Sequence, residues 1–392
     1  MTTNKRLYYL DWLRVLAFGL LFVFHSWRPF DHLEWHIKNE DQHTVFDILT
    51  LFTHGWRMHV IFLVSGAGTY FAMRSRKGKF IVDRLKRLIV PFLFGIVVLI
   101  PPQRFYEWKM FQSFEGGFLD FLSLYPIEQL HANMGASLLL WFGHLGTHLW
   151  YLPYLFVMTI ICIPLFKRIQ QGKIRFEWLK KIIATPTGVF ILFIPMLASR
   201  LILKPIFEGY TDWADFFIYL WSFVYGFIFM ADKEFIGLIA SRRHLLLILG
   251  LISSLIFMYL GASSDEMVLA YTSPGFDLLH ILTSTLAVLI ALCWTLFFLG
   301  LFARKMAFKH ALLIPANISI LPVYILHQTL IIVFGYYIVA VDLNLFIKFG
   351  LIVITAIPTS ILLYQLIRTN KITRFLFGLK SAIKHKGVVP YK

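Results

Sequence analysis

Long apolar segments recur along the whole chain, and no water-soluble fold can bury so many of them. A hydrocarbon core of about 30 Å is crossed by roughly 20 apolar residues in helical form. The segments of that length, or close to it, are 8–27, 46–73, 86–101, 146–166, 182–201, 212–231, 244–262, 276–302, 311–340 and 346–367. The sequence therefore predicts an all-α fold, a polytopic integral membrane helical bundle of about 10 transmembrane helices.

The composition agrees with a surface that faces lipid. Hydrophobic residues make up 58% of the 392 residues and charged residues 15%, whereas roughly 25% of a soluble protein is charged. The two cysteines, Cys162 and Cys293, both lie in apolar segments, so neither a disulfide framework nor a cysteine metal site is expected. No small-residue cleavage site follows the first apolar segment, and we expect that segment to be retained as a helix.

The positions of Lys and Arg predict the orientation of the bundle, because these residues concentrate in loops on the cytoplasmic side of a membrane. With the N-terminus in the cytoplasm, most of the 37 Lys and Arg residues fall on the cytoplasmic face and most acids on the opposite face. We therefore expect both termini to be cytoplasmic. The net charge of +16 then reflects orientation, and no nucleic-acid partner is expected. The predicted organisation is one transmembrane domain over 1–367, followed by a basic cytoplasmic tail over 368–392.

The first predicted helix carries three ionisable residues. Such a group at bilayer depth costs roughly 2.5–3.5 kcal/mol on insertion scales, so each one needs a partner or a function. At 100° per residue, Asp11, Arg14 and His25 lie on one face, and Arg14 and His25 are about 16 Å apart along the axis. We expect this stripe to face the protein interior, with His25 toward the outside. The alternatives are an Asp11–Arg14 pair that only orients the helix and a His25 that is an interfacial hydrogen-bonding residue.

The second predicted helix repeats this pattern. His54, Arg57 and Ser65 share one face, whereas His59 points elsewhere. A buried arginine beside a histidine and a serine favours an anion or a carbonyl as its ligand over lipid. The run Ser-Gly-Ala-Gly at 65–68 allows a ligand or another backbone to approach closely. A small-residue packing seam between helices is the alternative explanation for its glycines.

Two arginines stand at the inner end of the third predicted helix. Arg84 and Arg87 share a helical face, so they can hold one phosphate group of a soluble, nucleotide-like donor. The alternative is a positively charged anchor at the membrane surface or a contact with lipid headgroups.

Further polar residues lie on the later predicted helices. They are Asn317, Tyr324 and Gln328 along one stripe, His327 beside that stripe, and His148 and Trp150 at the outer start of segment 146–166. A lone buried histidine is more often a satisfied core residue than a catalyst. The predicted topology, however, places His25, His54, His148, His280 and His327 all in the outer half or the middle of the membrane, and this common depth favours a shared site. No helix face pairs histidines or acids at ligand spacing, so no metal site is predicted.

Five stretches of the chain resemble, in order, the motifs of the acyltransferase 3 family of membrane acyltransferases. They are YYLDWLRVLAFGLLFVFH at 8–25, HGWRMHVIFLVSG at 54–66, RLKRLIVP at 84–91, HLWYLPYLF at 148–156 and NISILPVYILHQ at 317–328. The second and fourth stretches look closest to the branch that contains glucan biosynthesis protein C, which is associated with glucan succinylation. The resemblance implies that residues 1–367 are a single transmembrane acyltransferase domain.

The resemblance also implies an O-acyltransferase, multi-pass in the bacterial cytoplasmic (inner) membrane. Such an enzyme moves an acyl group, succinyl or acetyl for example, from cytoplasmic acyl-CoA to a hydroxyl of an extracytoplasmic glycan, with no tightly bound cofactor. His25 is then the general base or, alternatively, the acyl carrier. The other residues assigned to catalysis are Asp11, Arg14, His54, Arg57 and His327. The donor is expected to contact Arg14, Ser65, Arg84 and Arg87, and the acceptor His148, Trp150, Asn317 and Tyr324.

Two more specific roles follow from this assignment. Asp11 is expected to hold Arg14 in place. The developing oxyanion, or the free carboxylate of a succinyl group, is expected to be stabilised by Arg57, His54 or Tyr324.

A transporter or exporter of a glycan or an acylated lipid is the alternative function, because buried Arg and His residues also line translocation paths. No inverted repeat is detectable in the sequence, which favours the enzyme. The acyl group and the acceptor stay open, and so does the number of copies, with a homo-oligomer among the alternatives.

Overall fold

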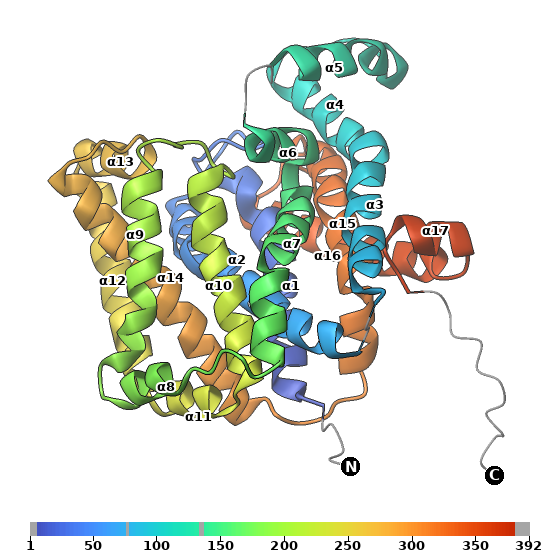
Figure 1. The fold of residues 1–392 in the computed structure, drawn as a ribbon. Helices are drawn as coiled ribbons and strands as arrows, with labels where there is room; N and C mark the ends of the chain where they lie inside the picture. Colours follow the sequence, from blue (N-terminus) through green and yellow to red (C-terminus); the bar gives the residue numbers. More distant parts are fainter. Residues whose placement is uncertain (1–5, 76–77, 133–136, 381–392) are drawn as a thin grey trace.

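The computed structural model describes residues 6–75, 78–132 and 137–380. Within these ranges the chain is helical and contains no β-strand. Figure 1 shows the long helices standing side by side in one bundle. This arrangement confirms the predicted polytopic helical bundle. Residues 381–392 of the predicted tail lie outside the described residues.

Nine segments of the described chain are long and apolar enough to cross a membrane. They are α1 (Tyr8–Trp27), α2 (Thr44–Ser75), α3 (Phe80–Val98) with α4 (Ile100–Phe111), α6 (Leu138–Gly146) with η2 (Thr147–Trp150) and α7 (Tyr151–Gln170), α10 (Trp213–Ala231), α12 (Arg243–Ser263), α14 (Leu278–Lys305), α15 (Leu313–Val339) and α16 (Leu345–Ile367). The remaining predicted segment, 182–201, corresponds to the shorter pair η3 (Gly188–Leu192) and α9 (Phe193–Leu203). This apolar pair packs against α10 and α14.

Several short helices lie at the two faces of the bundle, whereas α17 (Lys371–Leu376) packs beside α3. We call the face at which α1 begins the N-side and the opposite face the far side. Figure 1 shows α8 (Glu177–Ala184) and α11 (Glu234–Ser241) at the N-side, with α5 (Phe118–Ala132) and α13 (Asp265–Thr272) at the far side. Because successive long helices are antiparallel, the start of α1 and the end of α2 share the N-side.

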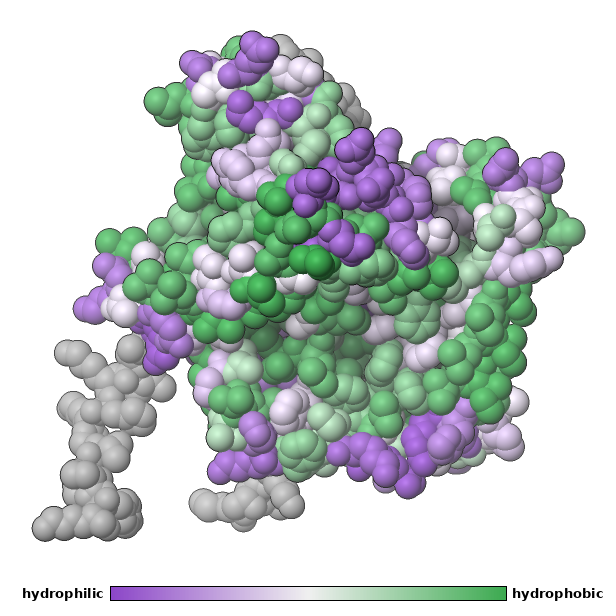
Figure 2. Space-filling model, turned by 180° about the vertical axis from the view of Figure 1, so that it is seen from behind, coloured by the Kyte–Doolittle hydropathy of each residue, from purple (hydrophilic) through white to green (hydrophobic). Residues whose placement is uncertain are grey.

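A broad apolar belt surrounds the bundle between these faces. Figure 2 shows hydrophobic residues across the middle of the molecule and hydrophilic residues gathered above and below. The large apolar side chains of α12 and α16 point outward, as Leu255 and Leu362 do with 66% and 62% of their surface exposed. Such side chains are stable only against lipid or another apolar partner.

α2 and α10 are in backbone contact, and this contact fixes the direction of α2. A Cβ added at Gly66 would lie 1.8 Å from the Phe223 carbonyl oxygen, and one at Gly226 would lie 1.9 Å from the Leu63 oxygen. Only glycine allows backbones to come this close. Gly66 therefore belongs to a helix-packing seam, which was the alternative explanation for this glycine.

α15 is one helix through Pro322. Its other proline, Pro315, is the third residue of the helix, where a missing N–H breaks no intrahelical hydrogen bond. The residues before and after Pro322 therefore face the core on one continuous helix, and they line cavities on both sides of the membrane centre.

Candidate active site

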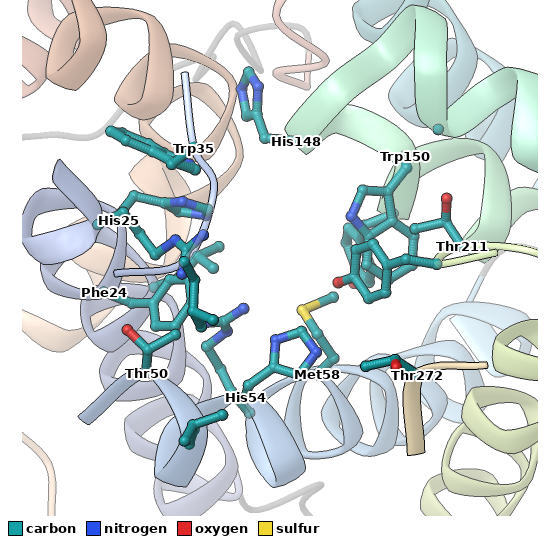
Figure 3. A pocket seen from close by; sticks show the side chains of 18 of the residues that line it. Phe24, His25, Trp35, Thr50, His54, Met58, His148, Trp150, Thr211 and Thr272 are labelled. Carbon is teal, nitrogen blue, oxygen red and sulfur yellow. The ribbon is translucent and has the colours of Figure 1, made fainter. Parts of the chain in front are cut away.

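A large cavity opens toward the far side of the bundle. It has a volume of about 940 Å³ and is lined by the end of α1, the first half of α2, the α6–α7 junction and the middle of α15. Figure 3 shows His25 and Trp150 on opposite walls, with His54 and His148 between them. The predicted site residues that line this far-side cavity are His25, His54, Arg57, His148, Trp150 and Tyr324.

His25 lies in the last turns of α1 and faces this cavity. Its ring centroid is 6.1 Å from that of Trp35, which lies nearly parallel to it, and 5.1 Å from that of His327. The Nδ1 atom of His25 is buried and has no hydrogen-bond partner among the described residues. The imidazole is therefore available to a ligand in the cavity.

Three histidine rings form a row from His25 through His327 to His148, with 5.1 Å between neighbouring ring centroids. His327 Nδ1 donates to the carbonyl oxygen of Tyr324, so its Nε2 carries the lone pair. His148 Nε2 lies 3.1 Å from the carbonyl oxygen of Ile325 and donates to it, so its Nδ1 is the acceptor. The backbone of α15 thus selects the tautomers of both rings.

Arg57 is a buried cation that faces the same cavity. Only 4% of its surface is exposed, and its guanidinium lies 3.5 Å above the ring centroid of Phe24. Its Nε and Nη1 lack hydrogen-bond partners, and no carboxylate in the described part of the chain forms an ion pair with it. Buried donors are normally satisfied, so this arginine is expected to meet an anionic or carbonyl ligand.

A second cavity, of about 640 Å³, opens on the N-side. The residues predicted to contact the donor all line it, namely Arg14, Ser65, Arg84 and Arg87, together with Arg74, Lys380 and one acid, Asp83. Arg84 Nη2 also donates to Thr69 Oγ1. A cavity with this excess of positive charge suits a ligand that carries several phosphate groups.

Arg14 is held by Asn317 and not by Asp11, so the predicted Asp11–Arg14 pair is wrong. Asp11 Oδ2 accepts from Arg6 Nε at 2.5 Å. Arg14 Nη1 lies 3.5 Å from Asn317 Oδ1, and its Nη2 is close enough to α2 that a Cβ at Gly68 would lie 2.9 Å away. Arg6 precedes the helix and can fold back onto its first turn, whereas Arg14 lies deeper, where Gly68 leaves room.

This arrangement also separates Asn317 from the other residues assigned to the acceptor. Asn317 lines the N-side cavity, and its Nδ2 donates to the Asp11 carbonyl oxygen at 3.3 Å. His148, Trp150 and Tyr324 line the far-side cavity. Asn317 lies two turns of α15 before Tyr324, and that rise carries it to the N-side of the membrane centre.

Three aromatic side chains line both cavities and separate them. They are Phe18, Tyr151 and Tyr324. Their ring centroids lie 5.6–6.2 Å apart, which is contact distance for aromatic pairs. We call this group the aromatic partition. Phe18 and Tyr151 gave no sequence signal of their own, although Tyr151 follows Trp150 directly in the stretch at 148–156.

The connection between α1 and α2 forms one wall of the far-side cavity. His36 and Gln328 both line the cavity and lie 3.0 Å apart between Nε2 atoms, and His36 Nδ1 pairs with Glu107 at 2.8 Å. Gln328 was predicted from its stripe on the ninth segment, whereas His36 was not predicted, although the histidines and acids of this long connection were a signal for it.

Asp31, which is fully buried, ties this connection together. It accepts from Arg28 at 2.6 Å, from Lys38 at 2.7 Å and from Thr50 at 2.8 Å. Burial lowers the pKa of Lys38, and the hydrogen bond to Asp31 opposes that shift. The wall that carries Trp35 and His36 is thereby fixed to the start of α2.

Comparison with known families decides what kind of domain surrounds these cavities. A family model described as an acyltransferase domain matches residues 7–365, which is nearly the whole chain. The chain belongs to the acyltransferase 3 family. All the residues of the far-side cavity, and all those of the N-side cavity except Lys380, lie within the matched acyltransferase domain.

Curated relatives of this acyltransferase 3 chain share the name glucans biosynthesis protein C. The protein from Escherichia coli strain SMS-3-5 is 31% identical over 171 residues, and those from Escherichia coli K12 and Shigella dysenteriae serotype 1 are 30% identical over the same length. These alignments cover 43% of this chain and 41% of each relative. The chain thus spans less than half the length of the curated relatives it matches. No solved structure matches it.

Proposed function

We propose that this chain is a membrane O-acyltransferase that passes an acyl group through the bundle, from acyl-CoA in the N-side cavity to a glycan hydroxyl in the far-side cavity. The observation that carries the proposal is the pair of cavities, one basic and one with an available imidazole, that share the aromatic partition. The acyltransferase domain match supports the class of reaction, and the names of the curated relatives support a glucan as the acceptor.

The N-side cavity provides the donor site in this proposal. Arg84 and Arg87 bind the phosphates of coenzyme A, and Arg14 lies deeper, beside Ser65 and the partition. The rise from Arg14 to His25 is about 16 Å, a distance that the extended pantetheine arm of coenzyme A can span. The acyl thioester then reaches His25 when the partition rings move aside.

The acyl transfer itself takes place in the far-side cavity. His25 takes the proton of the acceptor hydroxyl, and the hydroxyl oxygen attacks the thioester carbonyl carbon. The bond to sulfur breaks, the new ester leaves toward the far side, and the coenzyme A thiolate recovers the proton from His25. Arg57, with two unpartnered nitrogens at this cavity, stabilises the negative charge on the carbonyl oxygen. His327, whose Nε2 carries a lone pair beside His25, stabilises the protonated imidazole of His25.

The orientation and the location belong to the same proposal. The distribution of Lys and Arg supports an N-side that faces the cytoplasm, where acyl-CoA is made, in a bacterial inner membrane. His148 and Trp150 then bind the acceptor from the outside, together with Tyr324 and His54. No tightly bound cofactor takes part in these steps.

Mass spectrometry of surface and periplasmic glycans, with and without the gene, tests the function. The enzyme predicts that deletion removes an ester mass while the amount of carbohydrate outside the membrane stays the same. Loss of the carbohydrate itself would instead identify an exporter. An unchanged ester content after deletion of the gene would contradict the proposed function.

A further inference from the structure

A third cavity adjoins the far-side cavity and takes no part in the steps above. It has a volume of about 260 Å³ and lies between α2, α9, α10, α13 and α14. His54, Tyr210, Tyr271 and Thr272 line both this cavity and the far-side cavity. A substrate group can therefore extend into it past His54 and Tyr210 from the place where the substrates meet.

Arg200 on α9 is the residue that suits this cavity to an anionic ligand. We call the cavity the Arg200 pocket. The residue is only 7% exposed and its guanidinium lies 4.8 Å from the ring centroid of Tyr271. Its Nε is buried without a hydrogen-bond partner, and no acid among the described residues pairs with it. A buried arginine without a hydrogen-bond partner at Nε or a paired acid is costly unless a ligand supplies the missing partner.

The nearby acids do not neutralise Arg200. Lys204 lies 3.5 Å from Asp215 Oδ1 and donates to the Glu208 carbonyl oxygen at 2.9 Å. Asp215 Oδ2 accepts from the backbone N–H of Thr211 at 3.0 Å. Lys204 and Asp215 thus compensate each other, and the Glu208 side chain is exposed. Arg200 keeps an unpaired positive charge in the pocket.

The remaining lining leaves room for a small polar group. His59 Nδ1 lies 2.8 Å from Ser222 Oγ, so the protein already orients that ring. The volume corresponds to roughly nine water molecules, which is enough for a carboxylate or a phosphate with its nearest carbons.

We propose that the Arg200 pocket binds an oxyanion carried by a substrate, a carboxylate or a phosphate ester, while the reacting groups lie at His25. The proposal rests on the proposed acyl transfer and adds a charge requirement to it. Two sources can supply the oxyanion: an acyl group with a second, free carboxylate, or an acidic substituent on the acceptor glycan. In either case the guanidinium selects a charged substrate over its neutral analogue.

The test uses the full-length chain in lipid nanodiscs with two pairs of matched substrates. The donors are succinyl-CoA and butyryl-CoA, and the acceptors are a neutral gluco-oligosaccharide and the same oligosaccharide with one glucuronate. The variants are Arg200→Gln and Arg200→Lys, with Arg304→Gln as the control because Arg304 is exposed at the end of α14.

Arg200→Gln should raise KM for the charged member of one pair about tenfold or more, since hydrogen bonds to charged groups are the strong ones. Arg200→Lys should restore part of the preference, and Arg304→Gln should change nothing. A loss confined to succinyl-CoA assigns the oxyanion to the acyl group, and a loss confined to the glucuronate acceptor assigns it to the glycan. Equal losses with charged and neutral substrates, or no loss at all, would overturn the proposal.

A binding measurement keeps the pocket testable if no acyl transfer is detected or a variant unfolds. Millimolar succinate or inorganic phosphate should raise the Tm of the wild-type chain, and the Arg200→Gln variant should lose that rise while it keeps the cooperative transition of the wild type. If Arg200→Gln does not fold, Arg200→Lys takes its place. A wild-type chain that neither anion stabilises has no oxyanion site there, whatever the outcome for the transfer reaction.

Discussion

Tyr151 on α7 donates a hydrogen bond to Ser65 on α2, across 2.5 Å between their side-chain oxygens, at the point where the N-side and far-side cavities meet. The direction follows from the proton count, because Ser65 Oγ already donates to the Ile61 carbonyl oxygen at 2.8 Å. Ser65 therefore fixes the phenol of Tyr151, and with it one side of the aromatic partition. The two cavities are kept apart by a side chain with a defined orientation.

Removal of the Tyr151 ring should let water reach the donor thioester. We expect Tyr151→Ala to increase the release of free coenzyme A in the absence of acceptor, and to lower the fraction of acyl groups transferred to glycan. Tyr151→Phe keeps the ring and loses only the hydrogen bond, so it should resemble wild type more closely. Tyr259→Ala is a suitable control, because Tyr259 is 71% exposed on α12. A thiol assay of coenzyme A release measures the effect, and equal release from all variants would show that these rings do not form a barrier.

His25→Ala should abolish acyl transfer and leave the fold intact. A general base contributes about 10²–10⁴-fold to a rate, and the side chain is not part of a hydrogen-bond network in the described chain that its loss would break. His244→Ala, at the start of α12, is a matched control outside both cavities. Transfer measured with radiolabelled acyl-CoA at an unchanged Tm decides the point, and a His25→Ala variant with normal turnover would remove the proposed base.

The same variant separates direct transfer from an acyl-histidine route. Wild-type protein that is mixed with labelled acyl-CoA, without acceptor, should retain no label after rapid quenching if transfer is direct. Label that stays on wild type and is absent from His25→Ala would identify His25 as the acyl carrier.

The sequence could place single side chains but not their partners. The helical period puts His25 and Arg57 on buried faces, because 100° per residue needs only the local sequence. The bond from Arg14 to Asn317 joins residues 303 positions apart, and it depends on α1 and α15 being neighbours. The hydropathy of the segments does not specify neighbours, so the sequence alone favours the nearby Asp11 as the partner of Arg14.

The aromatic partition and the Arg200 pocket escaped sequence reasoning for a related reason. Phe18 is one apolar residue in an apolar helix, and nothing in the chain marks it as the ring that meets Tyr324. In the sequence, Arg200 is only one charge at the end of segment 182–201. Its burial follows from the packing of α9 against α10 and α14.

Arg57→Gln should lower activity and raise stability. Loss of a donor to the oxyanion typically reduces kcat about 10²–10³-fold. Removal of an unpaired charge at bilayer depth relieves a cost of roughly 2.5–3.5 kcal/mol, against about 0.5–2 kcal/mol lost with the cation–π contact to Phe24. The Tm should therefore stay equal or rise while kcat falls. A lower Tm together with normal kcat would make Arg57 a structural residue.

Arg84→Gln combined with Arg87→Gln should weaken donor binding through its phosphates. We expect KM for acyl-CoA to rise at least tenfold, because charge-assisted bonds to phosphate are lost, and kcat to change little. An acyl-pantetheine donor, which carries the same thioester without the nucleotide phosphates, should show no difference between this variant and wild type. A similar rise in KM with both donors would contradict phosphate binding and favour a role for the two arginines as a surface anchor.

Gly66→Ala should destabilise the bundle, whereas Gly19→Ala on α1 should not. The new methyl group at position 66 would lie 1.8 Å from the Phe223 carbonyl oxygen, and α2 and α10 must separate to admit it. Overpacking of this kind typically costs about 1–3 kcal/mol. At Gly19 no atom lies within 4 Å of the added Cβ, and alanine in the middle of a helix gains about 0.5–1 kcal/mol over glycine.

The Tm of Gly66→Ala and Gly19→Ala in nanodiscs checks this prediction. Gly68→Ala is a third variant to compare with them. At position 68 the methyl group would lie 2.9 Å from Arg14 Nη2, the end of a flexible side chain that can move at little cost. Gly68→Ala should therefore keep the Tm near that of wild type and raise KM for acyl-CoA, because Arg14 is pushed out of the N-side cavity. If Gly66→Ala and Gly68→Ala lowered the Tm equally, both glycines would belong to the packing seam and the room beside Arg14 would have no role in donor binding.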